Sequence, residues 1–195
     1  MATIQQRNHM VTLASILNRY APDVDYAQIR PMRTKGLPEY QLIHDLEHDI
    51  PITMDCSESV TLICRLSGLK DPNGLNYDGY GYTGTLLDHL PHFTDWHEVH
   101  KGTLIVFGGG TGEHVVMVTA PNGENPEVYS HGSHANHAIW DLNTERKYHE
   151  GQEIRLLAIA DRCPVDLTLV RGADVQTRLA EDEEAMPSTA VEEQG

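Results

Sequence analysis

A cysteine at the expected start of a helix is the residue of this sequence best placed to do chemistry. In the run "DCSES", Asp55 is followed three residues later by Glu58, and this D-x-x-E spacing is a variant of the capping box that begins helices. Cys56 would then be the first residue inside the helix, where the positive end of the helix dipole stabilises a thiolate, the attacking form of cysteine. The same pattern also fits a small buried residue that follows a helix cap. Cys56 is therefore a candidate nucleophile, and it requires a base.

Two histidines lie where a base for Cys56 is expected. His114 opens a predicted strand, "HVVMV", directly after the flexible "GGGTGE", and His131 ends the next predicted strand, "EVYSH", across the turn "PNG". A nucleophilic cysteine needs a general base and usually a third group that orients this base. If the two strands form a hairpin, the two imidazoles would come close together. The sequence leaves the register of that hairpin open.

The rest of the sequence predicts helices first and strands later. Apolar spacing, capping residues and glycine stops favour helices over 7–20, 39–50, 56–68 and 83–90. Short β-branched runs between turn signals favour strands over 102–107, 113–119, 126–131 and 153–160. This order indicates an α+β protein, in which N-terminal helices pack on a later antiparallel sheet. We expect an N-terminal helix and connector over 1–38, the main domain over 39–170, and an acidic, disordered tail over 171–195.

The composition excludes several classes of protein. The net charge of −15 over 195 residues argues against binding to nucleic acid and against electrostatic attachment to a membrane. The longest apolar runs are far shorter than the roughly 20 residues that cross a bilayer, and the N-terminus lacks the pattern of a signal peptide. Three cysteines without a C-x-x-C pair favour free thiols in a reducing, cytoplasmic compartment: Cys56, Cys64 and Cys163.

Four short motifs, in this order, make the sequence resemble the NlpC-type cell-wall cysteine peptidases. They are "DCS" at the start of a helix, "GTLIVF", "HVVMV" and "VYSHGS", and the resemblance covers roughly 40–160. It implies a papain-like fold in which Cys56 is the nucleophile, His114 the base and His131 the orienting group. It also implies a peptidoglycan stem peptide as substrate and partner, cut at the bond between γ-D-glutamate and a diamino acid. An unexported acidic chain would suit a phage-encoded lysin that acts on the cell wall after release.

Five residues are candidates for binding the substrate of such an enzyme: Tyr40, Asp55, Ser57, Tyr80 and Tyr82. Asp55 and Ser57 flank the candidate nucleophile, and Tyr40 is a candidate for a tyrosine that the family has upstream of its cysteine. Tyr80 and Tyr82 lie in "NYDGYGYTG", where glycines let the backbone approach a ligand. A turn-rich loop whose tyrosines cover the core would have the same sequence pattern.

No metal or cofactor is expected from the histidine-rich segments. The segment "HGSHANH" places His131, His134 and His137 at three-residue spacing, without a helical pattern that would bring their rings together. His44 and His48 are four residues apart on a predicted helix, but the glutamate of an H-E-x-x-H motif is missing. Both groups are more simply interpreted as polar surface.

Two other functions fit the same residues. An amidase of the related cysteine–histidine class would cut the bond between muramic acid and L-alanine with a similar order of histidine-bearing strands. A non-catalytic phage structural protein that retains the fold is the alternative outside the enzymes. Glu58 favours this alternative, because the NlpC-type family has glycine at that position. The oligomeric state is left open by the sequence.

Overall fold

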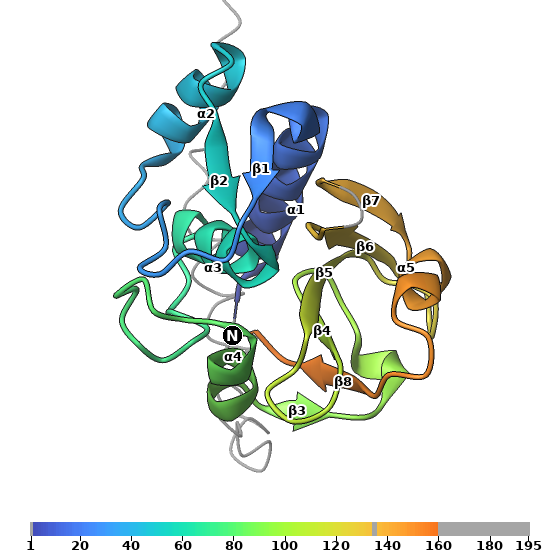
Figure 1. Cartoon of the computed structure of the whole chain (residues 1–195). Helices are drawn as coiled ribbons and strands as arrows, with labels where there is room; N and C mark the ends of the chain where they lie inside the picture. Colours follow the sequence, from blue (N-terminus) through green and yellow to red (C-terminus); the bar gives the residue numbers. More distant parts are fainter. Residues whose placement is uncertain (1, 134–135, 160–195) are drawn as a thin grey trace, which may run out of the picture. The chain divides into compact units, whose positions relative to one another are not determined.

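The computed structural model describes residues 2–133 and 136–159. The predictions that concern Cys163, His134 and the tail over 171–195 lie outside these residues. The described residues belong to one compact unit, with helices in the first half of the chain and an antiparallel sheet in the second (Figure 1). The predicted order of helices followed by an antiparallel sheet is therefore confirmed. Within the described part of the chain, no helix is long and apolar enough to span a bilayer.

Each of the four predicted helices is present. They are α1 (Ile4–Arg19), α2 (Glu39–Glu47), α3 (Cys56–Leu66) and α4 (Thr83–His89). The structure adds a fifth helix, α5 (Leu142–Tyr148), and two short 3-10 turns, η1 (Ala21–Asp23) and η2 (Trp96–Glu98). With only 7 residues, α5 is too short to show an apolar periodicity in the sequence.

A six-stranded sheet forms the second half of the unit. The spatial order is β3-β8-β4-β5-β6-β7, and every neighbouring pair is antiparallel. Its strands are β3 (His92–Phe93), β4 (Leu104–Phe107), β5 (His114–Ala120), β6 (Glu127–Ser130), β7 (Ala138–Asp141) and β8 (Ile154–Leu157). The four predicted strands correspond to β4, β5, β6 and β8. A separate parallel pair, β1 (Val24–Tyr26) and β2 (Ile52–Met54), lies in the helical half and was not predicted.

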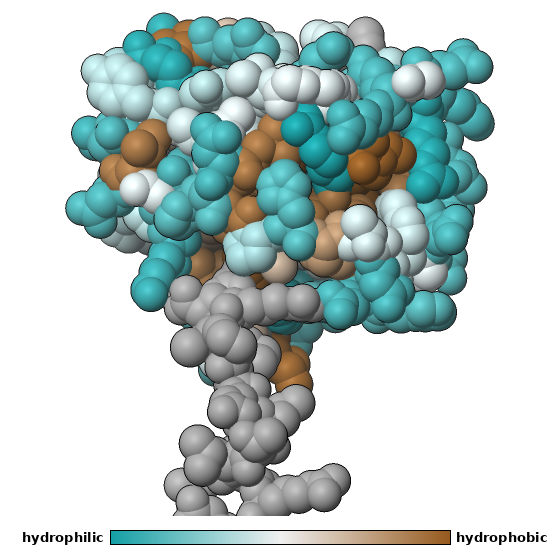
Figure 2. Space-filling view, turned by 90° about the horizontal axis from the view of Figure 1, so that it is seen from below, coloured by the Kyte–Doolittle hydropathy of each residue, from teal (hydrophilic) through white to brown (hydrophobic). Residues whose placement is uncertain are grey.

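Apolar side chains are buried on both faces of the six-stranded sheet. Leu104 and Val106 of β4 belong to a core that also contains residues of α1 and α3. Their neighbours Ile105 and Phe107 belong to a second cluster, to which α5 contributes Leu142. Because side chains alternate along a strand, the two clusters lie on opposite faces of the sheet. The surface seen from below is mostly hydrophilic, with apolar groups showing between the polar ones (Figure 2).

The register of the β5–β6 hairpin decides which way its two end histidines face. Met117 lies opposite Tyr129, so the side chains of this pair share one face of the sheet. Residues an odd number of positions from the pair face the other side, and His114 and Ser130 both do. His131 lies two positions beyond Tyr129 and therefore faces the side of Tyr129. The hairpin exists as expected, but its register turns the two histidines to opposite faces.

The start of α3 is capped by Asp55, as predicted, whereas Glu58 has an unexpected partner. The Oδ1 atom of Asp55 accepts the backbone N–H of Glu58 at 2.8 Å. The Glu58 side chain does not return to the cap: its Oε1 accepts the backbone N–H and the hydroxyl of Thr34, both at 2.8 Å. Burial raises the pKa of Glu58 in spite of these hydrogen bonds. Half of the predicted capping box is therefore present, and Glu58 instead ties the connector before α2 to α3.

Candidate active site

Cys56 lies where α3, β1 and β5 meet. It is the first residue of α3 and is 3% exposed. The imidazole of His114, the first residue of β5, interacts with its thiol. The hydroxyl of Tyr26, the last residue of β1, also interacts with the thiol. The candidate nucleophile and the candidate base are therefore neighbours in the structure.

His114 is buried and has two partners at its Nε2 atom. The hydroxyl of Ser130 is 3.0 Å away, and Oε1 of Glu145 is 3.2 Å away. These contacts leave Nδ1 as the nitrogen for the thiol of Cys56. Burial by itself would lower the pKa of His114, but hydrogen bonds and charge interactions with Cys56 and Glu145 outweigh burial and raise the pKa to about 9.

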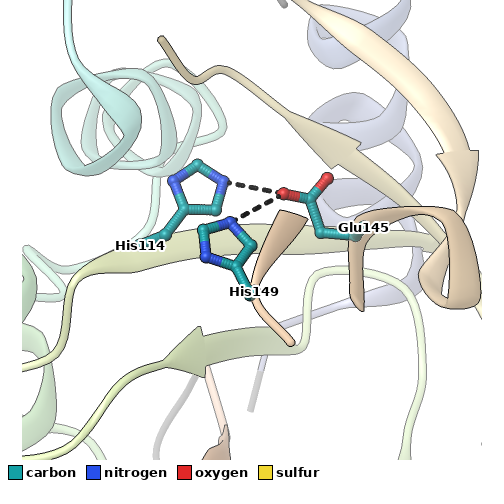
Figure 3. A group of neighbouring side chains, drawn as sticks. All are labelled: His114, Glu145 and His149. Carbon is teal, nitrogen blue, oxygen red and sulfur yellow. Dashed lines mark ion pairs between the residues drawn. The ribbon is translucent and has the colours of Figure 1, made fainter. Parts of the chain in front are cut away.

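Glu145, in α5, is the carboxylate that holds His114 in place (Figure 3). Its Oε1 atom also lies 3.3 Å from Nε2 of His149, and its Oε2 atom accepts the indole N–H of Trp140 at 2.5 Å. Burial would raise the pKa of Glu145. The hydrogen bonds with His114 and His149 more than offset burial, so the pKa lies well below the usual range of a carboxyl group. Glu145 is therefore a buried anion with donors at both oxygens.

His131 has other partners than the one predicted. Its Nε2 atom donates to the backbone carbonyl of Met54 at 3.0 Å, and its ring stacks on that of His137 with centroids 3.9 Å apart. Its Nδ1 atom has no hydrogen-bond partner among the described residues. Burial lowers the pKa of His131 and favours the neutral ring. The position predicted for His131, at the far nitrogen of His114, is occupied by Glu145.

A cleft of about 430 Å³ opens beside Cys56. Four of the five predicted substrate-binding residues line it: Asp55, Ser57, Tyr80 and Tyr82. The lining is completed by Gln28, Arg30, Thr83, Gly112 and Glu113. Tyr40, the fifth, lies on α2 with 75% of its surface exposed and does not line the cleft.

Arg30 joins the segments that form the cleft. Its Nη2 atom lies 2.8 Å from Oδ2 of Asp55 and donates to the hydroxyl of Ser57 at 2.8 Å. Its Nε atom donates to the carbonyl of Gly81 at 2.7 Å. A Cβ atom at Gly81 would lie 2.3 Å from the side chain of Asn73, so this loop requires glycine there. The contacts with Arg30 thus hold the side chains of Asp55 and Ser57 in place along one side of the cleft.

A second cavity, of about 230 Å³, gives access to the other partners of His114. Its lining includes Tyr26, Glu113, Ser130, Glu145 and His149. Glu113 also lines the cleft beside Cys56, so the two spaces are neighbours. His114 therefore faces the thiol with one nitrogen, and with the other it faces polar side chains that line this second cavity.

Several residues of the site were not among the predicted ones. Glu145 and His149 carry a signal that could have been used, because they are four residues apart behind a helix cap at Asp141. Tyr26 and Arg30 lie in a proline-marked connector, where nothing in the sequence marks them. The structure brings Cys56 and His114 together, and it places Glu145, not His131, beside the other nitrogen of His114.

The chain resembles a solved structure, whereas no protein-family model and no curated protein matches it. The similar structure is NlpC2 from Trichomonas vaginalis, with a TM-score of 0.47 and 12% identical residues. The match covers 82% of this chain and 49% of that chain, so this chain spans about half the length of the NlpC2 chain. Membership in the NlpC-type family and the papain-like fold stay predictions.

Proposed function

We propose that the chain is a cysteine hydrolase in which Cys56 attacks a carbonyl carbon, His114 transfers protons and Glu145 orients His114. The observation that carries this proposal is the contact between the thiol at the start of α3 and a histidine whose far nitrogen is held by a buried carboxylate. A nucleophile, a base and an orienting group in this order are what acyl transfer through a covalent intermediate requires.

The proton path follows from the two nitrogens of His114. Nδ1 takes the proton of Cys56, and the sulfur forms a bond with the carbonyl carbon of the substrate. The N–H at Nε2 faces Oε1 of Glu145 at 3.2 Å, so the imidazolium that forms lies beside an anion. Nδ1 then gives its proton to the leaving amine. Water, deprotonated by the same nitrogen, hydrolyses the thioester and frees the thiol.

The start of α3 supplies a donor for the negative charge that develops on the carbonyl oxygen. Cys56 is the first residue of an 11-residue helix, so its backbone N–H has no acceptor within the helix. The hydroxyl of Tyr26, which interacts with the same thiol, is a second donor. Burial and, after it, the nearby Cys56 raise the pKa of Tyr26 to about 12, so the hydroxyl keeps its proton at neutral pH.

For the substrate we propose a peptide of the bacterial cell wall, cut between γ-D-glutamate and a diamino acid. The support is the resemblance of the motifs that carry Cys56 and His114 to those of NlpC-type peptidases, whose papain-like fold we propose for this chain. The cleft agrees with a polar peptide. Arg30 provides a guanidinium, and Tyr80 and Tyr82 are 57% and 44% exposed and can pack on a ligand.

Digestion of purified peptidoglycan tests the proposal and identifies the bond. We expect new amino groups on the diamino acid; amino groups on L-alanine would show an amidase instead. Cys56→Ala should release none. The matched control is Cys64→Ala, because Cys64 lies in the same helix, is fully buried and has its thiol pKa raised by that burial. A folded Cys56→Ala variant as active as the wild type would contradict the proposal.

A further inference from the structure

His149 belongs to the site geometrically, yet the proposed hydrolysis does not use it. It follows α5 directly and shares Oε1 of Glu145 with His114. The two imidazole rings are nearly parallel, at an angle of 11°, with centroids 4.9 Å apart. One ligand atom from each of the three residues lies within 4.8 Å of the others. Two imidazole nitrogens therefore lie beside one carboxylate oxygen, and both nitrogens face that oxygen (Figure 3).

We propose that His114, Glu145 and His149 bind a divalent transition-metal ion such as Zn²⁺, and that the bound ion switches off the thiol chemistry of Cys56. The first half of this proposal stands on the three side chains alone. The second half rests on the proposed hydrolase function.

The type and spacing of the three ligands suit zinc. Two histidine nitrogens and one glutamate oxygen form a known ligand set of open zinc sites, in which water takes the fourth position. Bonds of about 2.0–2.1 Å in a tetrahedron place neighbouring ligand atoms about 3.3 Å apart. Oε1 of Glu145 lies 3.2 Å from Nε2 of His114 and 3.3 Å from Nε2 of His149. An ion can therefore take the place of the hydrogens between these nitrogens and Oε1 with small movements of the side chains.

The ligands are held in place by neighbours that do not themselves bind the ion. The indole N–H of Trp140 fixes the second oxygen of Glu145 at 2.5 Å. The ring of Phe107 stacks on that of His149 with centroids 4.7 Å apart. Such outer contacts orient metal ligands and strengthen binding. The cavity of about 230 Å³ that all three ligands line leaves room for a water molecule as the fourth ligand.

The ion and the proton compete at His114. When Nε2 binds a metal ion, the hydrogen of the neutral ring is confined to Nδ1, the nitrogen that faces Cys56. Nδ1 then has no free electron pair and cannot accept the thiol proton. Glu145 then binds the ion and no longer accepts a hydrogen bond from the imidazole. Zn²⁺ would therefore inhibit the proposed hydrolysis reversibly, and a chelator would restore it.

Titration of the full-length, metal-free chain with Zn²⁺, and with Co²⁺ as a spectroscopic probe, tests the site. The background variant carries His44→Gln and His48→Gln, because these two rings stack at 4.2 Å and form a separate pair that can bind ions. In this background we expect one equivalent of Zn²⁺ and the absorption of four-coordinate Co²⁺. Adding His149→Gln should weaken binding by more than about tenfold, since changes to outer contacts alone cost roughly 10–100-fold. Equal binding with and without His149→Gln would overturn the site.

Alkylation of Cys56 by iodoacetamide, followed by peptide mass spectrometry, tests the switch. One equivalent of Zn²⁺ should slow the reaction of Cys56 in the background variant and should not slow it after His149→Gln is added. Bound Zn²⁺ with an unchanged rate would overturn the switch. Slow alkylation of Cys56 with and without Zn²⁺ would contradict the hydrolase itself, whereas the metal titration would still decide the metal site.

Discussion

Glu145 is the residue on which the proposed site depends most. Its two oxygens take hydrogen bonds from His114, His149 and Trp140, and only 2% of its surface is exposed. A carboxylate is tolerated in a protein interior when it is paired, and removing one partner of such a group is strongly destabilising. Glu145 therefore holds the ring of His114 together with the Ser130 hydroxyl, and it supplies the negative charge at Nε2.

Glutamine substitutions separate the roles of Glu145 and His131. Glu145→Gln should lower kcat by about 100-fold with little change in KM, because a neutral amide stabilises the imidazolium of His114 less than an anion does. His131→Gln should leave kcat nearly unchanged and cost about 1–2 kcal/mol of stability, because it alters the hydrogen bond to Met54. Steady-state kinetics and urea unfolding measure both effects. A larger loss of kcat in His131→Gln than in Glu145→Gln would indicate that His131 orients His114.

The element that brings Glu145 to the site is α5. This helix has 7 residues and is capped at Asp141, whose side chain accepts the backbone N–H of Thr144. Its attachment to the sheet is apolar: Leu142 is fully buried in the cluster that contains Phe107 and Val116. A substitution of Leu142 that shifts α5 would therefore move Glu145 relative to His114, although neither of these two residues is changed.

Leucine-to-alanine substitutions in two helices test this dependence. Leu142→Ala in α5 and Leu17→Ala in α1 each remove a fully buried leucine, so both should cost about 2–5 kcal/mol in the free energy of unfolding. Only Leu142→Ala should also lower kcat, because α1 contributes no residue to the cleft or to the partners of His114. Activity is compared at a temperature where both variants are folded. An equal loss of kcat in Leu142→Ala and Leu17→Ala would show that lower stability alone explains the loss of activity.

Cys56 and His114 could be predicted because each lies at the boundary of an element with a strong local pattern. The capping residue Asp55 marks the start of α3, and the apolar run after "GGGTGE" marks the start of β5. Glu145 carries only a weaker signal, its spacing to His149 behind the cap at Asp141, because tertiary contacts, which the local sequence does not mark, bury its side chain. The role predicted for His131 depended on the register of β5 and β6, because a difference of one residue moves a side chain to the other face of the sheet.

On the scale of the whole unit, the cleft is assembled from segments that are far apart in the sequence. Its lining comes from residues 28–30, 55–57, 80–83 and 112–113. The hydrogen bond from Arg30 to Ser57 joins two of these segments, and next to them a buried contact joins Thr34 to Glu58. Glu58 is fully buried and burial raises its pKa, so its ionised form opposes folding.

The pH dependence of stability should show this effect of Glu58. A carboxyl group with a raised pKa in the folded state contributes stability that is present below its unfolded value, near 4.5, and is lost as the pH rises through the folded value. Glu58→Gln keeps an acceptor for Thr34 and cannot ionise, so its stability relative to the wild type should increase from pH 4 to pH 8. Urea unfolding at both pH values measures the difference. The exposed Glu47→Gln is the control, and an equal change in both variants would contradict the assignment.

The most direct measurement of the central claim is the alkylation rate of Cys56 near neutral pH in the wild type and in His114→Ala. An activated thiolate should react at least about tenfold faster than an ordinary cysteine, which is mostly protonated at this pH. The account predicts fast labelling of Cys56 in the wild type, a fall of about tenfold or more in His114→Ala, and a rate close to the wild type in His131→Gln. A Cys56 rate that His114→Ala leaves unchanged would contradict it.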